Sequence, residues 1–187
     1  MKAYTSNNIR NIAVLGHGGK GKTTLCEAML YIAGASDRLG RVADGNTVLD
    51  FDSEEKRRKS SVSSAIAALE WDNTKLNIID APGLFDFEGG AAEAVRAAEA
   101  VLIVTSAGSG VDVGTEKAFR AAEKKGAAKF FAITKTDSDH RNFYKTFDAL
   151  KEVYGNKLCP TIIPYMEGNI TKCYVNLMTG MAFSYDE

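Results

Sequence analysis

The chain has 187 residues, and its 23 basic and 24 acidic side chains leave a formal net charge of −1. This balance argues against nucleic acid as the main partner, and the ordinary apolar content predicts a globular domain with its own core. The three cysteines share no metal-ligand spacing, the N-terminus lacks a signal-peptide core, and no apolar run could span a bilayer. We therefore expect a soluble, cytoplasmic protein with no membrane partner.

The first predicted elements are a strand at 12–15 and a helix at 24–30, and the loop between them reads G-x-x-x-x-G-K-T over 16–23. This pattern in a strand–loop–helix context is typical of a phosphate-binding loop, whose amides and helix N-terminus surround phosphate oxygens. Lys22 is expected to reach the β- and γ-phosphates, and the Thr23 hydroxyl to bind Mg²⁺. The residues expected to contact the nucleotide here are His17, Gly18, Gly19, Lys20, Gly21, Lys22, Thr23 and Thr24.

A polar segment with little periodicity follows at 35–61, and a loop of this length is usually functional or mobile. Ser61 could supply a hydroxyl to Mg²⁺ when a γ-phosphate is present, as in a nucleotide-dependent switch loop. It could also be one of several ordinary loop serines. The residues alone leave both interpretations open.

The segments 62–71 and 75–80 flank a turn at 72–74 and predict a β-hairpin. Asp80-Ala81-Pro82-Gly83 follows the second strand. A carboxylate at this strand end can hold Mg²⁺, and the N–H of Gly83 can approach a γ-phosphate because no side chain intervenes. D-x-P-G is also a common turn sequence, but its place after a buried strand favours a functional role.

Helix-like and strand-like segments then alternate, and the pattern predicts an α/β, P-loop NTPase fold. We expect a mostly parallel sheet with one antiparallel hairpin and helices on both faces. The expected helices are 91–100, 115–125 (ending at Gly126) and 141–153, and the expected strands are 101–105, 129–134 and 161–163.

Thr134-Lys135-Thr136-Asp137 follows the strand at 129–134. The Asp137 carboxylate can accept hydrogen bonds from N1 and N2 of guanine, a donor pair that adenine lacks. The stem of Lys135 can lie along the base plane. The order of these elements predicts guanine binding by Thr134, Lys135 and Asp137.

Together these motifs resemble the N-terminal GTP-binding domain of translation elongation factor G. The similarity extends over Asn11–His17, the G-x-V-x-x-G-x-T-x-x-D segment at 40–50, 71–80 and Pro82–Phe87. The resemblance implies GTP/GDP and Mg²⁺ as ligands, with Thr23, Ser61 and Asp80 on the metal. It implies catalysis assisted by Lys22 and Gly83, and a role on the ribosome in translocation during elongation.

The tail at 166–187 breaks the alternation, although 173–175 and 181–183 are β-prone. The resemblance implies a GTP-binding domain at 1–165 and the truncated start of an inserted β-rich subdomain at 166–187. We expect a fragment of a longer protein, monomeric by itself, that meets the ribosome only through the full-length protein.

The chain departs from the elongation factor G pattern at four positions. Gly19 stands where the family usually has Asp, Ser61 replaces Thr and keeps the hydroxyl, and Thr134 replaces Asn. Leu84 stands where the family places a His that positions the attacking water, and a leucine cannot hydrogen-bond to water.

Two alternatives to a translational GTPase remain. Leu84 favours a GTP-binding regulatory module with little or no hydrolysis. The loop at 18–24 also resembles that of a partitioning-type ATPase, but the signature lysine of that group would fall at His17, and Asp137 argues for guanine.

Overall fold

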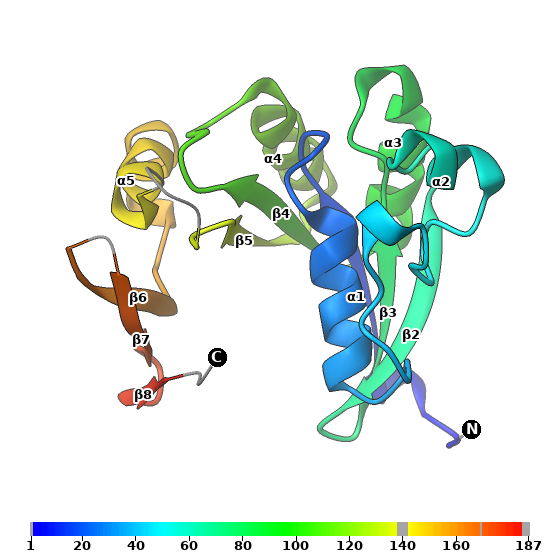
Figure 1. The fold of residues 1–187 in the computed structure, drawn as a ribbon, viewed down its shortest axis with the longest axis horizontal. Coiled ribbons are helices and arrows are strands. Elements are labelled where there is room, and N and C mark those ends of the chain that lie inside the picture. Colours follow the sequence, from blue (N-terminus) through cyan, green and yellow to red (C-terminus); the bar gives the residue numbers. More distant parts are fainter. Residues whose placement is uncertain (1, 138–141, 169, 185–187) are drawn as a thin grey trace. The chain divides into compact units, whose positions relative to one another are not determined.

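The computed structural model describes residues 2–137, 142–168 and 170–184 (Figure 1). They form two compact units, one of residues 1–105 and 112–132 and one of 106–111 and 133–187. The first unit is built around a five-stranded sheet, and the second contains a three-stranded sheet.

The large sheet has the order β2-β3-β1-β4-β5. Strand β1 pairs in parallel with β3 and β4, whereas β2 pairs with β3 antiparallel. The predicted mostly parallel sheet with one antiparallel hairpin is therefore confirmed. The strands are β1 (Ile9–Leu15), β2 (Ala65–Trp71), β3 (Thr74–Asp80), β4 (Ala100–Ser106) and β5 (Ala128–Thr134).

The hairpin turns at Asp72 and Asn73, whose φ angles are 45° and 58°. Positive φ at both central residues matches the right-handed twist of the two strands. Asp and Asn tolerate this backbone region better than most residues, so the local sequence fixes the turn and the register of β2 against β3.

Helices cover both faces of the sheet. Helix α1 (Lys22–Ile32) packs on β2 and β3, whereas α3 (Glu88–Ala97) and α4 (Val113–Lys125) pack on β1 and on each other. Because side chains alternate along a strand, β1 serves both layers. The buried cluster under α1 contains Val14, Cys26, Leu30, Leu49, Leu69, Ile78 and Val104.

Two expectations about these elements need correction. Segment 35–61 holds a short helix α2 (Ser53–Arg58), because Asp52 and Glu55 form a capping box that satisfies its first amides. The helix expected at 91–100 runs instead from Glu88 to Ala97, and β4 begins at Ala100, because alanine fits either structure and sheet pairing decides.

The second unit contains α5 (Phe143–Tyr154) and the antiparallel strands β6 (Ile162–Glu167), β7 (Ile170–Asn176) and β8 (Met181–Phe183). The β-prone segments of the tail are thus strands. The sequence pattern places the strand expected at 161–163 in the main sheet. That prediction is wrong, because Ile162 and Ile163 begin β6, which pairs with β7. Residue 141, the expected start of the preceding helix, lies outside the described residues.

The proposed division at residue 165 falls inside β6, and it stays a prediction. Among the described residues no helix has both the length and the apolar character needed to cross a membrane.

Candidate nucleotide site

The loop between β1 and α1 is shaped by glycines. Gly16, Gly19 and Gly21 have φ angles of 137°, 73° and 88°, a region that residues with a Cβ rarely adopt. Gly21 precedes the first helical residue, Lys22, and supplies no side-chain cap. The first amides of α1 therefore remain available for an anion at the helix N-terminus.

Lys22 lies under this loop and is only 6% exposed. Its Nζ donates to the carbonyl oxygens of Gly16 at 3.0 Å and His17 at 3.1 Å. Burial lowers the pKa of the Lys22 ammonium, and the neighbouring Asp80 carboxylate opposes that shift. The ammonium is thus held inside the loop by carbonyl oxygens that phosphate oxygens could replace.

A chain of hydroxyls and carboxylates lies at the start of α1. The Thr23 hydroxyl donates to Oδ2 of Asp80 at 2.6 Å and lies 3.1 Å from Oγ of Ser61. The Ser61 hydroxyl in turn donates to Oδ1 of Asp50 at 2.7 Å. The structure therefore brings together the three residues expected to bind the metal, Thr23, Ser61 and Asp80.

This chain of hydroxyls and carboxylates contains two carboxylate oxygens that have no partner among the described residues. Oδ1 of Asp80 and Oδ2 of Asp50 are buried without a hydrogen bond to any described residue. Burial raises the pKa of Asp80 to about 7, and the hydrogen bond from Thr23 opposes the shift. Burial also raises the pKa of Asp50. Unpaired buried oxygens of this kind are costly unless a cation or a proton compensates them.

Sequence reasoning missed Asp50 as a site residue. Its signal was present, because Asp50 closes the G-x-V-x-x-G-x-T-x-x-D segment. That segment lies within the polar stretch 35–61, whose sequence shows little periodicity, so no local pattern indicates that the Asp50 side chain turns inward to Ser61.

Gly83 lies directly against the phosphate loop. A Cβ built there would fall 2.2 Å from Nζ of Lys22 and 2.7 Å from the amide nitrogen of Gly18. Only glycine allows this approach. The next residue, Leu84, is 39% exposed, and its Cδ2 would lie 3.0 Å from a Cβ at Gly18. An apolar, partly exposed side chain thus lies beside the phosphate loop at this position.

The remaining loop residues have distinct surroundings. Nδ1 of His17 lies 3.1 Å from the Gly18 carbonyl oxygen, and its ring meets the Phe85 ring edge-on at 5.5 Å. Nζ of Lys20 lies 3.2 Å from Oδ2 of Asp112, the residue that caps α4. Thr24 is exposed on α1, as is Gly19 in the loop.

The three guanine candidates belong to the second unit. Thr134 ends β5, and its carbonyl oxygen accepts from the amide of Ala107 at 2.8 Å. Lys135 has a φ of 57°, and both it and Asp137 are exposed. Within its unit, Asp137 therefore presents an accessible carboxylate in the turn after β5.

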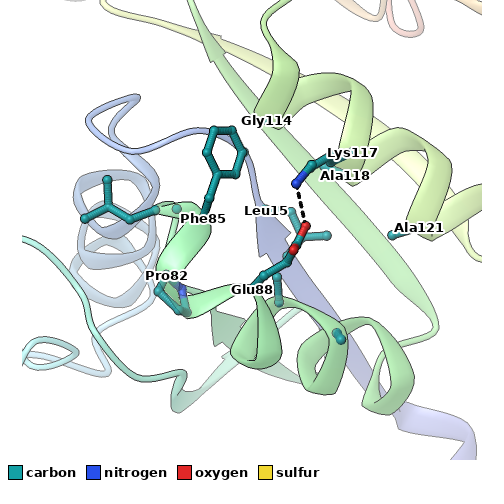
Figure 2. Close-up of a pocket in the computed structure, with 13 residues that line it drawn as sticks. Leu15, Pro82, Phe85, Glu88, Gly114, Lys117, Ala118 and Ala121 are labelled. Carbon is teal, nitrogen blue, oxygen red and sulfur yellow. Dashed lines mark hydrogen bonds and ion pairs between the residues drawn. The ribbon is translucent and has the colours of Figure 1, made fainter.

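A separate apolar cavity of about 300 Å³ lies between α3 and α4. Figure 2 shows Lys117 of α4 facing Glu88 of α3, 2.7 Å apart, with Phe85 and Pro82 beside them. Of the residues expected to contact the nucleotide, Gly83 alone lines the cavity. Its lining is chiefly apolar, with four alanines beside Leu15 and Phe85, in contrast to the hydroxyls and carboxylates around Thr23.

Comparison with known proteins places these features in a family. The sequence profile described as "Elongation factor Tu GTP binding domain" matches residues 7–184. A crystal structure of a protein from Thermus thermophilus superposes with a TM-score of 0.89 at 37% identity, covering 95% of this chain and 27% of that one. The α/β P-loop fold expected from the sequence is confirmed.

Curated relatives point the same way. The chain is 38% identical over 162 residues to an "Elongation factor G-like protein" of Mycobacterium tuberculosis, covering 87% of this chain and 23% of the relative. It is 32% identical over 185 residues to a protein of the same name from Synechocystis, covering 99% and 28%. The resemblance to elongation factor G is thereby confirmed. The chain spans about a quarter of the length of these relatives.

Proposed function

The chain belongs to the family of elongation factor Tu GTP-binding domains, and from this premise we propose that its phosphate loop binds Mg²⁺–GTP. The observation that carries the proposal is the convergence of Lys22, Thr23, Ser61 and Asp80 at one helix N-terminus. These residues come from three separate parts of the chain, so their meeting is a property of the fold.

The donor set fits a magnesium ion. Mg²⁺ prefers oxygen ligands and is usually bound by one or two carboxylates together with substrate phosphates. Thr23 and Ser61 offer hydroxyls, and Asp50 accepts a hydrogen bond from Ser61. Oδ1 of Asp80 and Oδ2 of Asp50 have no partner among the described residues. The described residues hold no group of three His, Cys, Asp or Glu side chains suited to a metal.

When bound, Mg²⁺ would neutralise charge between the β- and γ-phosphates. The protein's own part is positioning. The Lys22 ammonium would donate to phosphate oxygens in place of the carbonyl oxygens of Gly16 and His17. The backbone amides of 17–24 would surround the same phosphate oxygens. Gly83 would direct its N–H toward the terminal phosphate. Its position against Gly18 in the phosphate loop is close enough for this role.

We assign guanine recognition to Thr134, Lys135 and Asp137. A carboxylate can accept from both N1 and N2 of guanine, and the turn after β5 presents Asp137 to solvent. A competition assay in which ATP displaces GTP would instead support the partitioning-type alternative.

We further propose that the chain acts as the GTPase domain of a longer factor that works on the ribosome in translation elongation, in the cytoplasm. Relatives with printed names such as "Elongation factor G" and "Ribosome-releasing factor 2, mitochondrial" support a ribosomal role. The division into 1–165 and the start of an inserted subdomain at 166–187, and a monomeric state, belong to the same proposal.

Hydrolysis depends on what replaces the missing histidine. Leu84 has no group that could orient a water, so a regulatory module with little turnover is the second candidate. The deciding test is single-turnover GTP cleavage by the full-length protein, with and without ribosomes. Stimulation by ribosomes supports the translational GTPase. Tight GTP binding without cleavage under either condition supports the regulatory module.

A further inference from the structure

Two buried glutamates outside the expected site call for an explanation. Glu27 is fully buried and Glu55 is 3% exposed, although glutamate is almost never buried unless it is paired. Neither carboxylate belongs to an ion pair among the described residues. Both bind backbone amides of the segment between α1 and β2 instead.

Glu27 lies one turn after Thr23 on α1, so the two side chains share a face of the helix. Its Oε1 accepts from the amides of Val48 at 2.8 Å and Leu49 at 3.0 Å. Oε2 is buried without a partner in the described part of the chain and lies against Gly40, where a Cβ would approach it to 2.1 Å. The glycine is therefore needed to admit this carboxylate.

Glu55 likewise accepts hydrogen bonds from backbone amides, at the C-terminal end of the segment between α1 and β2. Its Oε1 accepts from the amides of Val62 at 2.9 Å and Ser63 at 3.1 Å. Its Oε2 accepts from the amide of Asp52 at 3.3 Å, which closes the capping box of α2. One carboxylate thus joins the start of α2 to the chain that leads into β2.

The amides held by the two glutamates border the two site residues of this segment. Asp50 directly follows Leu49, and Ser61 directly precedes Val62. The Asp50–Ser61 hydrogen bond of 2.7 Å and the Ser61–Thr23 contact of 3.1 Å lie between these two anchored points. Each end of the stretch that carries Asp50 and Ser61 is thus held by a buried carboxylate.

We propose that Glu27 and Glu55 are positioning residues of the metal–nucleotide site. They hold the backbone on either side so that Ser61 lies beside Thr23, and Asp50 beside Ser61, before the cation and γ-phosphate arrive. Preorganisation of this kind lowers the ordering cost of binding. The inference rests on the proposed binding of Mg²⁺–GTP, and neither glutamate touches the metal or the nucleotide.

The experiment compares the affinity for a fluorescent GTP analogue in saturating Mg²⁺ and in EDTA, with thermal unfolding recorded in parallel. The variants are Glu27→Ala and Glu55→Ala, with Glu27→Gln and Glu55→Gln as conservative partners that keep one acceptor oxygen. Glu54→Ala is the matched control, because Glu54 lies on α2 beside Glu55 but pairs with Arg57 and Arg58 at the surface.

The Mg²⁺ effect is the ratio of the GTP-analogue affinity in Mg²⁺ to that in EDTA. We expect this ratio to fall by at least about tenfold in each alanine variant, while the affinity in EDTA changes by less than about twofold. The glutamine variants and Glu54→Ala should keep most of the Mg²⁺ effect. Equal losses in Mg²⁺ and EDTA, or no loss, would overturn the positioning role. If the unsubstituted protein gains no affinity from Mg²⁺, the proposed function itself fails.

Gly40→Ala is a second route if an alanine variant does not fold. It leaves α1 unchanged but places a Cβ 2.1 Å from Oε2 of Glu27 and 2.8 Å from Cα of Thr47. We expect the same selective loss of the Mg²⁺ effect, and a normal Mg²⁺ effect in this variant would count against the role of Glu27.

Discussion

The hydroxyl of Thr23 donates a 2.6 Å hydrogen bond to Oδ2 of Asp80 across 57 positions of sequence. This bond joins the first turn of α1 to the end of β3, and it leaves Oδ1 of Asp80 buried without a partner in the described part of the chain. Five predictions test what the surrounding residues do.

The first concerns the pH dependence of stability. Burial raises the pKa of Asp80 from 3.8 to about 7, so the folded state binds this proton more tightly than the unfolded state. Without metal or nucleotide, the free energy of unfolding should therefore fall as pH rises from about 4 to about 7, by up to about 1.4 kcal/mol per pH unit. Asp80→Asn should flatten this decline in urea unfolding with EDTA. If the free energy of unfolding changes with pH equally in the unsubstituted protein and in Asp80→Asn, this prediction is contradicted.

The second separates binding from folding at Lys22. Lys22→Met keeps much of the side-chain volume but removes a buried ammonium, whose desolvation lowers its pKa. We expect GTP affinity to fall by about 100-fold or more while the free energy of unfolding changes little or rises. Calorimetric titration and urea unfolding measure the two quantities. A parallel loss of both would show that Lys22 is needed chiefly for folding.

The third tests the approach of Gly83 to the phosphate loop. In Gly83→Ala, the new Cβ meets backbone atoms of Gly18 and His17 at 2.7 and 2.8 Å. We therefore expect the free energy of unfolding to fall by about 1–3 kcal/mol. Gly89→Ala is the matched control, because nothing lies within 4 Å of its Cβ and it sits in α3. We expect it to be neutral or stabilising by about 1 kcal/mol in thermal unfolding. Equal effects would argue against close packing at Gly83.

The fourth addresses turnover. Leu84→His introduces a side chain that can hydrogen-bond to water, and a positioned proton-transfer group contributes about 10²–10⁴ to rate. We expect single-turnover GTP cleavage on ribosomes to rise at least about 100-fold, with Leu84→Met unchanged as the apolar control. If cleavage is already fast in the unsubstituted protein, another group orients the water.

The fifth concerns base choice. Asp137→Asn replaces one acceptor oxygen by an amide donor, so N1 and N2 of guanine lose a partner while the 2-oxo group of xanthine gains one. GTP affinity should fall by about 10-fold or more and XTP affinity should rise in competition titrations. An unchanged preference for GTP would place guanine recognition elsewhere.

Much of the fold was predictable because it is encoded locally. Asp72 and Asn73 favour the turn of the β2–β3 hairpin, Gly126 ends α4 with a φ of 72°, and buried apolar runs predict the central strands. Helix α2 was missed because its stability comes from the capping box of Asp52 and Glu55 rather than from an apolar stripe. Strand β6 was assigned to the wrong sheet because pairing partners leave no mark on a short apolar run.

The sequence by itself determined the phosphate loop, the carboxylate that ends β3 and the acidic residue after β5, since each belongs to a short motif at the end of one strand. Only the tertiary structure decided that Asp50 joins Ser61 and that Glu27 and Glu55 hold the segment around them. These contacts link Glu27 to Leu49 and Thr23 to Ser61 across 22 and 38 positions. No local propensity encodes such contacts: they form because a buried carboxylate must find donors, and packing α1 against β2 and β3 brings those amides within reach.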